Sequence, residues 1–125
     1  MAIAFRAAGT WTAGTTSIAP PLPAGVAAGD IMLLAVHTPN QAVTTPANWT
    51  QVTTSPVSTG TAAAAGGTRI TLFYRLWQSG DTAPTVAVTG GNNTQARIFA
   101  YSGVDTTTPF DATPVATTLA TANTA

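Results

Sequence analysis

The residues that could carry acid–base or nucleophilic chemistry are few and far apart in the sequence. His37 is the only histidine, and the chain has neither cysteine nor glutamate. Ser17, Asp30 and His37 supply the residue types of a hydrolytic triad, but no Gly-x-Ser-x-Gly elbow accompanies them and nothing in their spacing brings them together. Because His37 directly follows the apolar run 31–36, the sequence predicts a structural residue at a surface position at the end of a strand.

The four acidic residues all occur in turn-like sequence. Asp30, Asp81, Asp105 and Asp111 lie close to Gly, Thr or Pro, where a short carboxylate typically caps backbone N–H groups. Two converging carboxylates would suit a glycosidase, and several oxygen ligands would suit calcium. No Asp-x-Asp spacing supports either reading. The sequence therefore favours turn capping and predicts a protein that is not an enzyme, with no catalytic residue, no cofactor and no metal.

Three arginines lie on predicted strands and alternate with aromatic residues. Arginine, tryptophan and tyrosine are common anchors of protein interfaces, and aromatic rings also stack on sugars. If the strands pair, one face of the sheet would carry both residue types. The candidate interaction surface consists of Arg69, Phe73, Arg75, Trp77, Arg97 and Tyr101. In the alternative reading, the aromatic rings fill the core and the arginines are solvated.

Short β-strands are the elements that would position these residues. Threonine makes up roughly a fifth of the chain and suits pleated, half-buried surfaces. Alternation is clearest over 68–77, where Ile70 and Leu72 share one face and Thr71 and Phe73 share the other. No helical apolar stripe competes with this pattern. We predict an antiparallel β-sandwich, jelly-roll-like, with about eight short strands. The other clear strands are expected at 2–7, 11–18, 31–36, 49–54, 85–89 and 96–101, with 31–36 buried on both faces and Trp49 pointing inward.

Length and charge limit the organisation and the partners. The chain of 125 residues fits one domain, predicted as a β-sandwich over 1–112 followed by a Thr/Ala-rich C-terminal arm or edge strand over 113–125. Lysine is absent and the net charge is zero, which argues against nucleic acid and anionic membranes as partners. The run 31–36 is far shorter than a membrane span. Low net charge favours a place in an assembly.

Four sequence phrases occur together in an order that resembles a known module. They are LPAGVAAGDIMLL at 22–34, PANWTQV at 46–52, FYRLWQSGD at 73–81 and AYSGVD at 100–105. The order is similar to that of a β-sandwich module in bacteriophage virion proteins, especially of phages that infect high-GC Gram-positive hosts. The resemblance covers most of residues 16–112, and the module has no known catalytic residues.

The resemblance implies a structural role in the virion. The expected function is that of a capsid decoration (cement) protein that stabilises the head through contacts with the major capsid protein or other virion proteins. The alternative is a minor tail or fibre module that binds host cell-surface glycan through Trp49, Trp77 and Tyr101. Longer relatives continue beyond the matching Thr/Ala-rich stretch with further strands. The sandwich is therefore expected either to be short or to be completed by strands from a neighbouring copy, and the second alternative favours a homo-oligomer on the capsid or tail surface.

Overall fold

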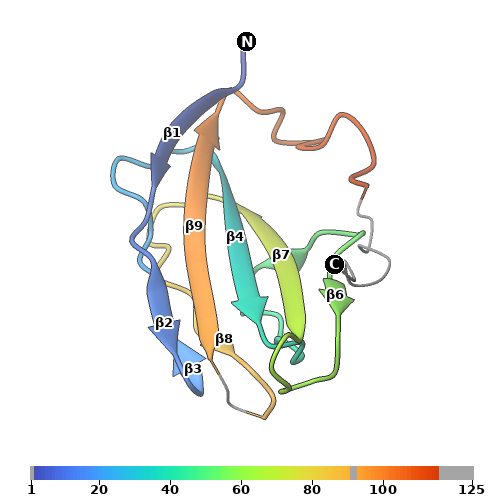
Figure 1. The fold of residues 1–125 in the computed structure, drawn as a ribbon. Helices are drawn as coiled ribbons and strands as arrows, with labels where there is room; N and C mark the ends of the chain where they lie inside the picture. Colours follow the sequence, from blue (N-terminus) through green and yellow to red (C-terminus); the bar gives the residue numbers. More distant parts are fainter. Residues whose placement is uncertain (1, 91–92, 116–125) are drawn as a thin grey trace.

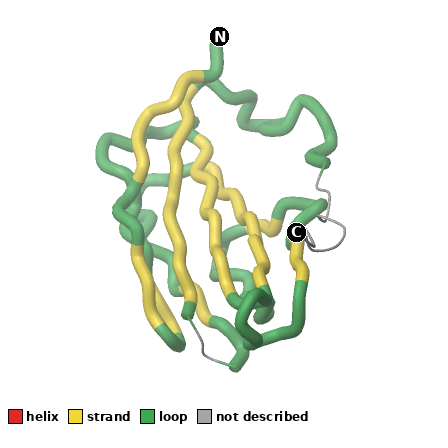
Figure 2. The backbone as a smooth tube through the Cα atoms, in the orientation of Figure 1, coloured by secondary structure: helices red, strands yellow, loops and turns green. Residues whose placement is uncertain are grey.

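The protein is built from β-strands alone in the part of the chain that the structure, a computed structural model, describes: residues 2–90 and 93–115 (Figures 1 and 2). Every strand pairing is antiparallel. The predicted all-β class is confirmed, and the jelly-roll connectivity stays a prediction. The strands are β1 (Ala4–Ala8), β2 (Thr12–Gly14), β3 (Ser17–Ile18), β4 (Ile31–Thr38), β5 (Thr50–Gln51), β6 (Val57–Thr59), β7 (Thr68–Leu76), β8 (Val86–Ala87) and β9 (Thr94–Ser102).

One large sheet dominates the fold. Its strand order is β1-β9-β4-β7-β5, with β2 pairing with β9 beside β1 and β6 pairing with β7 beside β5. The three long strands β9, β4 and β7 lie next to one another in the middle of the sheet (Figure 1). Strands β3 and β8 form a separate two-stranded sheet. The two layers are therefore very unequal, because the second sheet consists of two very short strands and the loops around them.

The hydrophobic core lies on one face of the large sheet, which we call the inner face. The register places Leu34 opposite Phe73 on β7 and opposite Ile98 on β9, and all three side chains are fully buried. Because cross-strand partners point to the same side of a sheet, these residues form one apolar layer. Ile18 of β3, Val86 of β8 and Trp49 close the core from the other side. The inward position predicted for Trp49 is confirmed, since 7% of its surface is exposed.

The opposite face of the large sheet, which we call the outer face, is covered less completely. Leu33 and Ala35 of β4 point to this side and are only half-buried. The expected burial of 31–36 on both faces is therefore met on the inner face and only partly on the outer face. Residues 103–115 cross part of the outer face after β9, and Phe110 packs edge-on against Tyr74 with ring centroids 5.0 Å apart.

Several predicted strands are shorter in the structure. The expected strand 49–54 is reduced to β5, and 85–89 to β8, since both lie in proline- and turn-rich sequence with little backbone pairing. The expected strand 11–18 is divided between β2 and β3, which belong to different sheets. Of the predicted C-terminal arm, residues 116–125 lie outside the described residues.

Candidate interaction surface

The six residues predicted to form one surface do not share one face of the sheet. Strand β4 lies between β7 and β9, and Arg97 is opposite Ala35, which is opposite Leu72. Odd-numbered residues of β9 therefore point to the outer face, whereas odd-numbered residues of β7 point to the inner face. The expectation of a single Arg/aromatic face is wrong. Through their pairing with β4, the odd-numbered residues of β7 and those of β9 are placed on opposite faces of the sheet.

The predicted residues of β7 serve the fold. Phe73 is fully buried, and the half-buried Trp77, just after β7, packs against the same core. Arg69, at the start of the strand, donates from Nε to Oδ1 of Asn40 at 3.2 Å. The alternative reading, in which aromatic rings fill the core, is confirmed for Phe73 and Trp77. Arg97 and Tyr101 remain on the outer face, where the guanidinium of Arg97 lies 5.4 Å from the ring centroid of Phe99.

Arg75 of β7 forms an ion pair with Asp81 in the turn after this strand, and it also binds the loop before β5. Arg75 donates to the Asp81 carboxylate from Nε at 2.8 Å and from Nη2 at 2.5 Å, and its Nη1 donates to the Asn48 carbonyl at 2.7 Å. The hydrogen bonds from Arg75 lower the pKa of Asp81, assisted by the Gln78 backbone N–H and opposed by burial. The same pairing raises the pKa of Arg75. The contact fixes the turn after β7 to the loop before β5.

Replacement of Asp81 by asparagine is expected to reveal an acid-sensitive contribution to stability. Because the pKa of Asp81 is lower in the folded state, the ion pair stabilises the protein at neutral pH and loses its effect as acid protonates the folded carboxylate. Asp81→Asn should cost about 1 kcal/mol at pH 7, and the difference from wild type should shrink as the pH falls below 3.8, the ordinary aspartate pKa. Urea unfolding at pH 7 and below this pKa measures the difference. Thr82→Asn, at the exposed neighbouring position, is the matched control; an equal loss in both variants would contradict the assignment.

Asp30 and His37, two of the residue types of a hydrolytic triad, have other partners in the structure. The Asp30 carboxylate accepts hydrogen bonds from Arg6 Nη2 at 3.0 Å and from the Ala27 backbone N–H at 2.8 Å. His37 Nε2 lies 2.9 Å from Thr68 Oγ1 on the neighbouring strand. His37 is therefore half-buried near the end of β4 and not at the surface position that was expected, and its side chain pairs with a hydroxyl group on β7.

Turn capping by aspartate is confirmed at three of the four positions. Asp30 and Asp81 each accept a backbone hydrogen bond from three residues upstream. Asp105 accepts backbone hydrogen bonds from Thr107 at 2.7 Å and Thr108 at 3.2 Å, and these bonds lower its pKa. Within residues 2–90 and 93–115, no group of three or more His, Cys, Asp or Glu side chains is placed to hold a metal ion.

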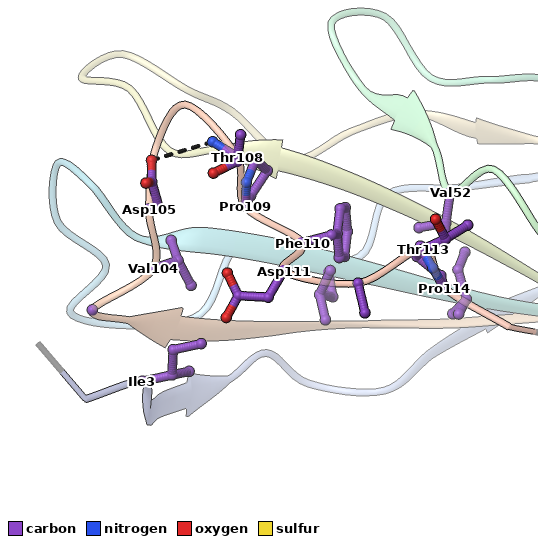
Figure 3. A pocket seen from close by; sticks show the side chains of 14 residues that line it. Ile3, Val52, Val104, Asp105, Thr108, Pro109, Phe110, Asp111, Thr113 and Pro114 are labelled. Atoms are coloured by element: carbon purple, nitrogen blue, oxygen red, sulfur yellow. Dashed lines mark hydrogen bonds between the residues drawn. The ribbon is translucent and has the colours of Figure 1, made fainter.

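An apolar groove on the outer face is the feature that the sequence reasoning missed. The groove has a volume of about 700 Å³ and lies between the sheet and residues 103–115 (Figure 3). A smaller hollow beside it is lined by Val57, Ile70 and Val115, among others. The large apolar side chains that line the groove come from β4, β7, the positions just before β1 and just after β5, and the segment 103–114: Ile3, Leu33, Val52, Leu72, Val104 and Phe110.

Exposed apolar side chains gather around this groove. Six large apolar side chains are exposed among the described residues, and five of them lie on the outer face or at the groove and hollow. Phe5, 59% exposed, packs edge-on against Tyr101 with centroids 5.7 Å apart. These five are Ile3, Phe5, Ile70, Leu72 and Val115. The alternation over 68–77 placed Ile70 and Leu72 on the opposite side of the strand from Phe73. Which of the two sides is exposed depends on where the second, smaller layer of the fold packs.

The aromatic platform expected for glycan binding is not formed. Trp49 is buried and Trp77 packs against the core, whereas Tyr101 lies on the outer face of the sheet. Stacking on a sugar requires exposed ring faces on one surface, which these three residues do not provide together.

In the described part of the chain, no helix is long and apolar enough to cross a membrane. Comparisons with protein-family models, curated proteins and solved structures give no match.

Proposed function

We propose that this protein is a structural component of a bacteriophage virion, a capsid decoration protein that binds neighbouring proteins through the outer face of its large sheet. The observation that supports a binding role is the gathering of exposed apolar side chains around the groove. Soluble domains rarely leave apolar side chains clustered on one face unless a partner covers them. The virion as the place of action is supported by the resemblance of the sequence to phage modules.

The fold suits such a role. The inner face holds a closed core, so the outer face can be covered by a partner without disturbing it. Ion pairs such as Arg75–Asp81 hold the loops at the periphery in place. The carbohydrate-binding alternative is not taken further, because two of its three aromatic residues belong to the core.

The location is tested by gold-labelled antibodies against this protein on purified particles of the phage that encodes it. We expect label distributed over the head. Label confined to tail tips would contradict the decoration role, and particles without label would contradict a virion role altogether.

The binding face is tested by a charge placed at its centre. Leu72→Asp puts a carboxylate on the outer face at a side chain that is 38% exposed, so we expect the domain to fold and its binding to particles that lack the protein to fall at least tenfold. Ala24→Asp adds the same charge at an exposed position of the layer that covers the inner face. Equal binding by the two variants would contradict the assignment of the outer face.

A further inference from the structure

The charges of the protein are distributed unevenly with respect to the groove. Arg6 pairs with Asp30, and Arg75 pairs with Asp81. The two remaining carboxylates, Asp105 and Asp111, have no arginine partner among the described residues, and both line the groove (Figure 3). No arginine lines it. The groove is therefore the acidic end of the outer face, although the chain as a whole has zero net charge.

The same face carries a positive charge on the β9 side of the groove. Arg97 points outward from β9 beside Ala35 of β4, whereas Leu72, which lines the groove, lies on the other side of Ala35, on β7. Its guanidinium lies over Phe99 and donates from Nε to the Gly9 carbonyl at 2.8 Å, which holds the side chain in place without neutralising its charge. The outer face thus has an acidic end, an apolar centre and a fixed cation.

The size of the face matches that of a protein interface. Strands β7 and β9 have nine residues each, which corresponds to a length of about 30 Å. The strand order β1-β9-β4-β7-β5 gives a width of about 20 Å. The resulting area, on the order of 600 Å², is close to the about 800 Å² that each partner contributes to an interface of standard size.

We propose that the outer face packs against the outer face of a second copy of this chain, related by a two-fold axis, so that Arg97 of each copy approaches Asp111 of the other. A two-fold interface is self-complementary, and this face is complementary to itself in charge when one copy is turned end for end. The apolar centres around Leu72 and Phe5 then cover each other, and the two large sheets become the layers of one sandwich. The inference rests on the proposed function, since it names a second copy as the neighbouring protein that covers the outer face; the dimer is then the form that binds the particle.

Charge reversal with complementation tests the pairing. Asp111→Arg and Arg97→Glu each place like charges at both symmetric contacts, so each variant alone should dimerise at least tenfold more weakly than wild type. An equimolar mixture of the two variants restores both opposite-charge contacts and should form heterodimers with near wild-type affinity. Sedimentation equilibrium at low salt measures all three samples, and Ala24→Arg, on the other side of the domain, should dimerise as wild type.

The possible results distinguish a failure of the proposed dimer from a failure of the proposed function. A wild type that stays monomeric at a protein concentration of about 100 µM overturns the dimer. If the wild type dimerises but the mixture of the two folded variants stays monomeric, the pairing of Arg97 with Asp111 is overturned. If Arg97→Glu does not fold, Asp111→Arg decides alone, and unchanged dimerisation overturns the pairing. If the protein is a monomer and still binds particles, the dimer is overturned and the virion role stands. If the protein is a dimer and binds no particle, the virion role is overturned and the dimer stands.

Discussion

Replacement of Phe73 by alanine is expected to lower the free energy of unfolding by about 3–5 kcal/mol. Phe73 is fully buried on the inner face, opposite Leu34, and belongs to the cluster that contains Ile98 and Val86. Truncation removes a large apolar side chain and leaves a cavity, because the neighbouring strands are fixed by the pairing of β4 with both β7 and β9. A loss of this size is a large part of the stability of a small domain.

Leu72→Ala is the matched control for this prediction. Leu72 is adjacent in sequence, lies on the same strand and is 38% exposed on the outer face. Its truncation should cost no more than about 1 kcal/mol. Urea unfolding followed by tryptophan fluorescence gives both values. If the two variants lose the same stability, the distinction between a closed inner face and an open outer face is wrong.

Replacement of Arg6 by methionine is expected to cost about 2–3 kcal/mol, the second largest effect. Arg6 pairs with Asp30, whose side chain is 2% exposed, and donates from Nη2 to Oδ1 at 3.0 Å. Without Arg6, the carboxylate stays buried with the Ala27 N–H as its remaining hydrogen-bond donor. The Arg6 side chain is 36% exposed, so solvent screens part of the attraction and the estimate falls below that for a fully buried pair. The ion pair also fastens β1 to the turn before β4.

Two further variants decide whether the buried charge is the cause. Arg6→Met combined with Asp30→Asn removes the carboxylate that the single variant leaves unpaired, so the double variant should be more stable than Arg6→Met alone. Arg69→Met removes an arginine whose partner is the neutral side chain of Asn40, and should cost about 1 kcal/mol or less. Thermal unfolding of the four proteins at pH 7 gives the comparison. A double variant no more stable than Arg6→Met would contradict this explanation.

Local pattern was sufficient for the class of fold and for most strand positions. Alternation over 68–77 and 96–101 predicted β7 and β9, and the apolar run 31–36 predicted β4, because side chains of a strand point alternately to its two sides. Turn-forming neighbours correctly indicated capping by Asp30, Asp81 and Asp105. Short strands such as β5 and β8 were placed less well, since two-residue pairings depend on neighbouring strands that are distant in the sequence.

The sequence by itself determined that Phe73 and Leu72 lie on opposite sides of one strand. Only the tertiary structure decided which side is the core, because alternation defines two faces and the second layer covers one of them. Only the register decided that Arg97 and Phe73 lie on opposite faces of the sheet. The pairing of β4 with β7 and its pairing with β9 each fix separately which residues of the partner strand point to which face. The groove beneath residues 103–115 likewise required segments far apart in the sequence to meet.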